Sequence, residues 1–205
     1  MIDRASWSAA WQGIGARSAG TELHHRLVAA WSEKHRHYHT LQHLRECFEH
    51  LEAVRAQARH SAEIAIALWF HDAVYDPQRE DNEARSADWA RASALDDGVP
   101  QATAQRLHGM VMATVEHLPQ EDADTQLLLD IDLSILGAGP ARFAQSNEQI
   151  RREYAHVAEP EWRVGRRRVL CGFLERPRLY GTEGFHATLE ARARENIARE
   201  LAALQ

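Results

Sequence analysis

The chain has 205 residues, 44% hydrophobic and 26% charged, which is the composition of an ordinary globular protein with a sizeable core. Its formal net charge of −6 argues against duplex nucleic acid as a partner, because neutralising the phosphates of a duplex needs a basic face. No stretch approaches the ~20 apolar residues of a membrane span, and the N-terminus lacks a signal-peptide pattern. We therefore expect a cytoplasmic protein that has no membrane partner.

The sequence predicts an all-α fold. Good helix formers dominate, apolar residues recur at spacings of three and four, and no run has the alternation of a strand. We expect a single HD-type bundle of roughly eight to ten helices over residues 1–205, with a metal-site core at about 35–137 and C-terminal helices at 140–203 packed on it. In chain order, helices are expected near 3–12, 21–33, 40–58, 61–70, 81–95, 100–117, 125–135, 140–156, 161–175 and 186–201.

Hydroxyl side chains mark the starts of three of these helices. Thr21 and Ser61 are predicted to be N-caps, because a hydroxyl can accept a hydrogen bond from the free backbone amides of the first turn. Thr40 is expected to begin the third helix.

Two histidines stand near the start of that third helix. His39 and His43 are four residues apart and share a helix face, a spacing that suits a shared metal or a proton donor beside a ligand. The alternative is a pair of histidines hydrogen-bonded to backbone at a helix start. The spacing alone leaves both interpretations open.

Acidic groups also interrupt two very apolar helices. His71 and Asp72 end the run 64–70, where burying an ionisable pair is unfavourable unless a cation compensates the charge. The alternative is that Asp72 accepts hydrogen bonds from amides of the following turn. Asp130 and Asp132 lie two residues apart within an apolar helix, so at most one should face a given ion; the alternative is a buried aspartate paired with an arginine.

Taken together and in this order, these features resemble the HD superfamily of metal-dependent phosphohydrolases, in particular a bacterial branch described as predicted HD phosphohydrolases without an assigned substrate. The resemblance covers most of the chain, from about Trp7 to Leu201. Its matching stretches are Arg36–His43, Trp69–Asp76, Asp81–Glu83 with Ser86 and Ala87, Leu129–Gly137 and Ile150–Tyr154. The resemblance implies that His43, His71, Asp72 and Asp132 are metal ligands.

The activity implied by this resemblance is the hydrolysis of a small phosphorylated metabolite or nucleotide by a metal-activated water. The enzyme could be a phosphomonoesterase, a phosphodiesterase or a pyrophosphohydrolase. Asp72 could hold or deprotonate the water. His39 matches the proton-donating histidine of cyclic-nucleotide phosphodiesterases, although this chain has Thr40 where those enzymes have asparagine.

Two imidazoles and two carboxylates suit a divalent ion such as Mn, Fe, Co, Ni, Zn or Mg. One ion is expected. Some HD relatives hold two, and His108 and His117 would then be the further ligands; ordinary surface or helix-cap histidines are the alternative for both.

The substrate site is predicted from residues on or near the matched stretches. Arg36 is the predicted phosphate contact, and Asn82 and Glu83 could reach the rim of the pocket. Capping of the fifth helix is the alternative for Asn82.

Two other functions remain open at this point. The chain could be a non-catalytic HD module that binds metal and nucleotide, or a di-iron protein similar to HD oxygenases, for which His108 or His117 would have to be true ligands. The apolar C-terminal helices could pack on the domain or on a second copy in a homo-oligomer.

Overall fold

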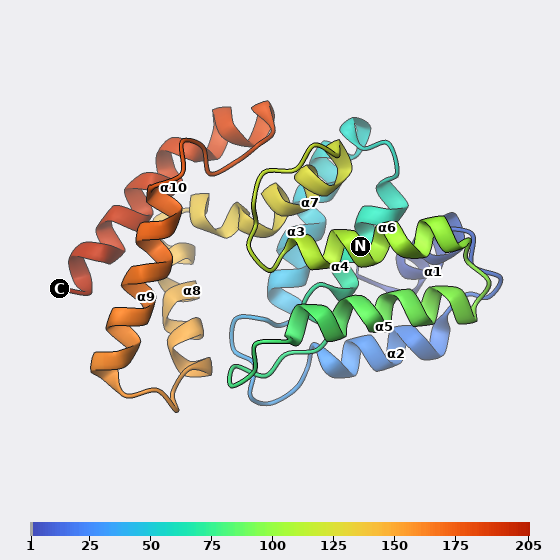
Figure 1. Ribbon diagram of the computed structural model, residues 1–205, viewed down its shortest axis with the longest axis horizontal. Helices are drawn as coiled ribbons and strands as arrows, with labels where there is room; N and C mark the ends of the chain where they lie inside the picture. The colour runs from blue at the N-terminus through green and yellow to red at the C-terminus, as the bar shows by residue number, and fades with distance from the viewer. Residues whose placement is uncertain (1) are drawn as a thin grey trace. The chain divides into compact units, whose positions relative to one another are not determined.

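The computed structural model describes residues 2–205, and within this range it contains ten α-helices, two short 3-10 helices and no strand (Figure 1). The predicted all-α class and number of helices are confirmed. None of the helices in this range is long and apolar enough to cross a membrane. The α-helices are α1 (Arg4–Gly13), α2 (Thr21–Ala30), α3 (Leu41–Val54), α4 (Ser61–Phe70), α5 (Asn82–Asp96), α6 (Gln101–Ala113), α7 (Ala123–Asp132), α8 (Pro140–Glu153), α9 (Glu159–Leu174) and α10 (Glu183–Ala203), and the 3-10 helices are η1 (Arg55–Gln57) and η2 (Leu133–Gly137).

By its internal contacts the chain divides into an N-terminal unit that ends at Leu129 and a C-terminal unit from Asp130 to Gln205. Helix α4 is the centre of the N-terminal unit. Its residues from Glu63 to Phe70 are all buried, and α1, α3, α5 and α6 contact it. This packing follows from the apolar run 64–70, which offers no polar face to solvent. The residue after α4, His71, therefore lies in the core.

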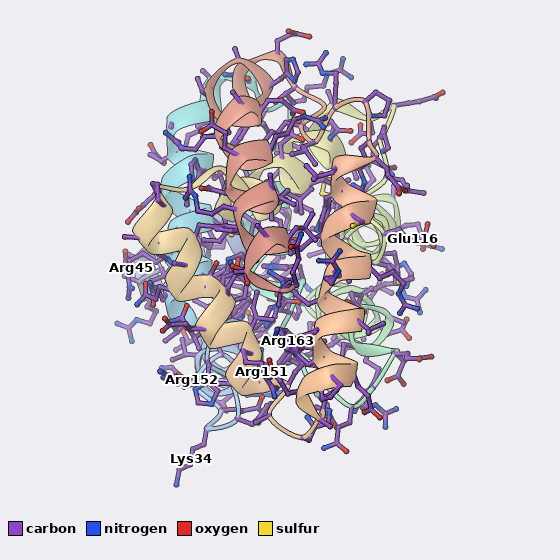
Figure 2. All side chains as sticks on the ribbon, turned by 90° about the vertical axis from the view of Figure 1, so that its left-hand side faces the viewer. Lys34, Arg45, Glu116, Arg151, Arg152 and Arg163 are labelled. Carbon is purple, nitrogen blue, oxygen red and sulfur yellow. The ribbon has the colours of Figure 1, made fainter. Side chains whose placement is uncertain are left out.

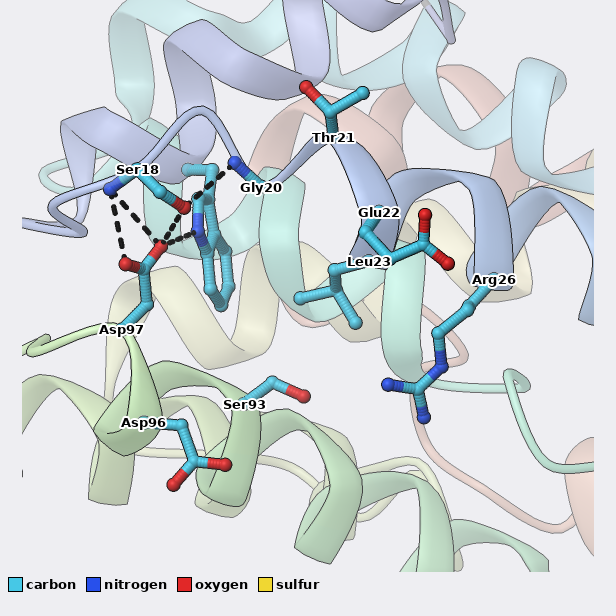
Figure 3. Close-up of a pocket in the computed structure, with 10 residues that line it drawn as sticks. Ser18, Gly20, Thr21, Glu22, Leu23, Arg26, Ser93, Asp96 and Asp97 are labelled. Atoms are coloured by element: carbon cyan, nitrogen blue, oxygen red, sulfur yellow. Dashed lines mark hydrogen bonds between the residues drawn. The ribbon is translucent and has the colours of Figure 1, made fainter.

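The turn between α1 and α2 is tied to the end of α5 (Figure 3). Asp97 accepts hydrogen bonds from the indole N–H of Trp11 and the hydroxyl of Ser18, both 2.6 Å long. Gly20, not Thr21, is the N-cap of α2, so the prediction for Thr21 is wrong. Gly20 has a φ of +59°, and a Cβ there would lie 2.7 Å from Cδ1 of Trp11, so the tight turn requires glycine.

The starts of α3 and α4 are capped in different ways. Thr40, which was expected to begin the third helix, is the N-cap of α3, and its hydroxyl accepts from the N–H of Gln42 at 3.3 Å. Ser61 is already helical, and the N-cap of α4 is His60, so the predicted cap at Ser61 is wrong. The buried carboxylate of Asp124, on α7, instead accepts from the backbone N–H groups of Arg59 and His60, each at 2.8 Å.

In the C-terminal unit, η2 packs against α10. The buried carboxylate of Asp130 accepts from the N–H groups of Gly181 and Thr182, at 2.9 and 2.7 Å, and from the Thr182 hydroxyl at 2.6 Å. Thr182 is the N-cap of α10, so Asp130 holds the loop that leads into this helix. These partners differ from the arginine considered as an alternative for one of the two aspartates.

Helices α8 and α9 are joined by an ion pair. Glu159, in the first turn of α9, pairs with Arg151 of α8 at 3.1 Å and with Arg163 at 2.9 Å. Both arginines are labelled in Figure 2. The guanidinium group of Arg151 also lies over the ring of Trp162, 5.3 Å from its centroid. Arg151 therefore holds the start of α9 against the end of α8, while the pair with Arg163 lies within α9.

Candidate metal centre

His71 follows the last residue of α4, and its side chain is only 1% exposed. Its Nδ1 atom lies 2.8 Å from the carbonyl oxygen of Leu68. Because a carbonyl can only accept, this contact assigns a proton to Nδ1, and in the neutral ring it leaves a lone pair on Nε2. The fold thus presents His71 in the tautomer that a metal ligand needs.

His43 lies in the first turns of α3 and is also buried. Its Nε2 atom is 3.2 Å from Nε2 of His71, and its Nδ1 atom is 3.2 Å from the hydroxyl of Tyr38. The ring of Trp31 packs beside both imidazoles, with centroid distances of 5.4 Å to His71 and 6.3 Å to His43. Two imidazole nitrogens, one from α3 and one from the residue after α4, therefore converge beside the ring of Trp31.

The carboxylate of Asp72 joins this pair, because its Oδ2 atom lies 3.1 Å from Nε2 of His71. The Asp72 side chain is 15% exposed, so it lies at the edge of the buried pair. Asp132 is the last residue of α7. His43, His71 and Asp132 form a group that could hold a metal ion, since one ligand atom of each lies within 4.8 Å of those of the other two.

The donor set fits a divalent ion. Nitrogen atoms 3.2 Å apart can both reach an ion at the bond length of ~2.0–2.1 Å typical of Zn–imidazole. The third donor is a carboxylate, which suits borderline and hard divalent ions alike.

His39 does not belong to the group of three. It is half-buried, and its ring packs 4.2 Å from the ring of Tyr75 and 4.8 Å from that of Tyr38, measured between centroids. Its centroid lies 6.3 Å from that of His43. His39 is therefore a neighbour of a candidate ligand, and its role as a proton donor stays a prediction.

Two of the three residues predicted to contact substrate, Arg36 and Asn82, are engaged with backbone. The Arg36 guanidinium donates to carbonyl groups on two segments, including those of Asp72 and Ala73. The side-chain amide of Asn82 donates to the carbonyl oxygen of Asp76 at 2.9 Å, and it accepts from the backbone N–H of Asp76 at 3.1 Å. Glu83 lies in the first turn of α5 and is half-buried. Substrate contact by these three residues stays a prediction.

His108 and His117 are the candidate ligands of a possible second ion, with ordinary surface or helix-cap histidines as the alternative. Nε2 of His108 lies 3.4 Å from a carboxylate oxygen of Asp88, on α5. His117 follows α6 in a left-handed conformation, with a φ of +50°. Within residues 2–205, neither belongs to a set of three ligand residues close enough to share an ion. The second ion stays a prediction.

Two neighbours of His43 were not found from the sequence. Cys47 lies one helical turn after His43, and its Sγ atom is 3.7 Å from both ring nitrogens. The i,i+4 spacing could have identified it. Tyr38 precedes the helix, where no periodicity relates it to His43, so the sequence carried no signal for that contact.

Comparisons of the chain with protein-family models, with curated proteins and with solved structures gave no significant match.

Proposed function

We propose that this chain is a metal-dependent phosphohydrolase of the HD type, which acts on a small phosphorylated metabolite or nucleotide. The proposal is carried by one observation: ligand atoms of His43, His71 and Asp132 lie within 4.8 Å of one another. The order of these residues along the chain, with Asp72 directly after His71, is the pattern that the HD resemblance implies.

In this proposal His43, His71, Asp72 and Asp132 hold a divalent ion. Such an ion, when bound, lowers the pKa of a water ligand and polarises the phosphoryl group. The buried imidazoles contribute neutral nitrogen donors, and the carboxylates offset the positive charge of the ion. The carbonyl of Leu68 keeps the proton of His71 on Nδ1, and therefore away from the donor atom.

The remaining chemistry belongs to two side chains. Asp72, at the exposed edge of the site, accepts a proton as the water oxygen forms its bond to phosphorus. His39 donates a proton to the leaving oxygen as the old phosphorus–oxygen bond breaks, which balances the reaction. The ring of Tyr75 packs against His39 and would limit its rotation.

The first test is metal dependence. Protein treated with a chelator is expected to lose hydrolysis of bis(p-nitrophenyl) phosphate and p-nitrophenyl phosphate, and to regain it with Mn²⁺, Co²⁺ or Ni²⁺. Turnover of both esters that persists unchanged after verified metal removal would refute the proposal.

The second test uses ligand variants. His71→Ala and Asp132→Asn should each abolish metal-dependent turnover, because each removes one of the converging donors. His25→Ala is the matched control, since it removes an exposed histidine on α2 that is not part of the site. Full metal-dependent activity in His71→Ala would rule out this mechanism. A protein that binds the ion and a nucleotide but forms no product would instead be a binding module.

A further inference from the structure

Arg36 is a buried cation at the point where the two histidine-bearing segments meet. Its Nη1 atom donates to the carbonyl oxygens of Asp72, at 2.6 Å, and His39, at 3.3 Å. Its Nη2 atom donates to the carbonyl oxygen of Ala73 at 3.0 Å. One guanidinium group therefore joins the segment before α3 to the turn after α4.

The surroundings of Arg36 leave its guanidinium group little freedom. Nε donates to a carboxylate oxygen of Glu33 at 3.0 Å, and the side chain of Arg36 is 0% exposed. The rings of Trp31 and Tyr75 lie 5.6 and 5.3 Å from the guanidinium carbon. Four of its five N–H groups are thus used by the protein itself. A phosphate group would have to displace these contacts to reach it.

Two of the three carbonyls that Arg36 binds, those of Asp72 and Ala73, belong to the turn that presents the candidate ligands. Helix α4 ends at Phe70, so the carbonyls of Asp72 and Ala73 lie beyond its hydrogen-bond ladder and need donors from elsewhere. Arg36 supplies those donors. Because the Asp72 side chain branches from the same residue, fixing this backbone also fixes the origin of its carboxylate.

We propose that Arg36 is a positioning residue of the metal centre, which holds the His71–Asp72 turn in register with the segment that leads to His43. This inference rests on the proposed metal site. It replaces the direct substrate contact predicted for Arg36 with an indirect role that acts through backbone. Arginine is specific for this role, because only a planar fork of donors can serve carbonyls from two segments together.

The experiment measures metal affinity without any substrate. Binding of Mn²⁺ and Co²⁺ to the full chain is followed by calorimetry, and for Co²⁺ also by its visible absorption, in wild type, Arg36→Met and Arg36→Lys. Arg36→Met keeps the length of the side chain but removes every donor, and it should weaken metal binding about 10–100-fold, the range typical of lost supporting contacts. Arg36→Lys, which keeps the charge and some donors, should fall in between.

Arg106→Met is the matched control. Arg106 makes a bidentate pair with buried Glu63, at 2.8 and 2.5 Å, and so joins α6 to α4 outside the site. Its loss should lower the melting temperature and leave metal affinity within about twofold of wild type.

The outcomes separate the two proposals. Wild-type metal affinity in Arg36→Met, combined with a raised KM for phosphoesters, would restore the substrate role and overturn the inference. If Arg36→Met and Arg106→Met lose metal affinity equally, the loss is an effect of lower overall stability. This result would also overturn the inference. If Arg36→Met does not fold, Arg36→Lys takes its place, and a metal affinity equal to that of wild type in this variant would overturn the inference. A wild-type chain that binds no divalent ion would overturn the proposed function itself, and this inference with it.

Discussion

The hydroxyl of Tyr38 lies 3.2 Å from Nδ1 of His43, while Nε2 of the same ring faces Nε2 of His71 at 3.2 Å. A metal-binding Nε2 requires the proton of this neutral imidazole on Nδ1, where the Tyr38 oxygen can accept it. Tyr38 therefore has the position of a supporting residue for the candidate ligand. The Leu68 carbonyl has the same relation to His71.

Tyr38→Phe is accordingly expected to weaken binding of Zn²⁺ or Mn²⁺ about 10-fold or more, because the Nδ1 proton loses its acceptor. Competition with a chromophoric chelator would measure the affinity. The change in melting temperature should stay small, since the ring itself remains. Metal affinity equal to that of wild type would show that the Tyr38 contact does not support His43 as a ligand.

Substitutions of Asp130 and Asp132 should have different effects, the first on the stability of the protein and the second on metal binding. Asp130→Asn is expected to lower the free energy of unfolding by about 1–3 kcal/mol, because the loop before α10 loses a charged acceptor for its N–H and O–H groups. Asp132→Asn should abolish or strongly weaken metal binding. Denaturant titrations measure the stability of both variants, and calorimetry measures their metal affinity. If only Asp130→Asn loses metal affinity, then Asp130 and not Asp132 is the metal ligand.

Gly137 ends η2 at a very close approach to α10. A Cβ at this position would lie 2.7 Å from Cβ of Leu189 and 3.0 Å from the Tyr180 hydroxyl oxygen. Gly137→Ala should therefore destabilise the protein by about 1–3 kcal/mol through overpacking. In Gly165→Ala, within α9, the added methyl group meets nothing within 4 Å, and it should stabilise by about 0.5–1 kcal/mol. If thermal unfolding shows that both variants change the stability of the protein in the same direction, this packing is contradicted.

His24 should make stability depend on pH. It is buried beside the rings of Trp7 and Trp69, and this burial lowers its pKa from the usual 6.5, while the nearby charges of Asp3 and His25 act in opposite directions. The unfolded chain therefore binds the proton at a higher pH than the folded chain does. The contribution of the neutral, buried His24 to the stability of the fold is complete above about pH 6.5. It is lost as the pH falls through the lowered pKa. In His24→Phe the melting temperature should change less between pH 7 and pH 5; an unaltered profile would point to other groups.

The elements that could be predicted from the sequence are those whose signal is local. The apolar run 64–70 predicted a helix surrounded on all sides, and α4 is that helix. Thr40 was expected at the start of the third helix, and it is the N-cap of α3, bonded to the N–H of Gln42 two residues away. The cap of α4 could not be found in this way. The helix begins at Ser61, as expected, but Ser61 is not its N-cap, and the carboxylate that binds the backbone N–H groups of Arg59 and His60 comes from Asp124, 65 and 64 residues further along the chain.

In the site, too, some features could be predicted from the sequence and others depend on contacts between distant segments. The convergence of His43, His71 and Asp132 was expected from the resemblance to the HD superfamily, which rests on the order of the motifs and on buried charge in apolar helices. The engagement of Arg36 with backbone could not be predicted, because a linear pattern does not reveal which carbonyl groups lack donors in a distant turn. HD membership, the substrate and the organisation as one domain stay predictions.

The position of Trp31 gives this protein an internal reporter. Its indole lies against both imidazoles, and its Nε1 donates to the carbonyl of Trp69 at 2.9 Å, which fixes the ring. A paramagnetic ion such as Co²⁺ or Ni²⁺ captured by the histidines would be close enough to quench the emission of this indole. Occupancy could then be followed by fluorescence in the unlabelled chain, independently of any turnover.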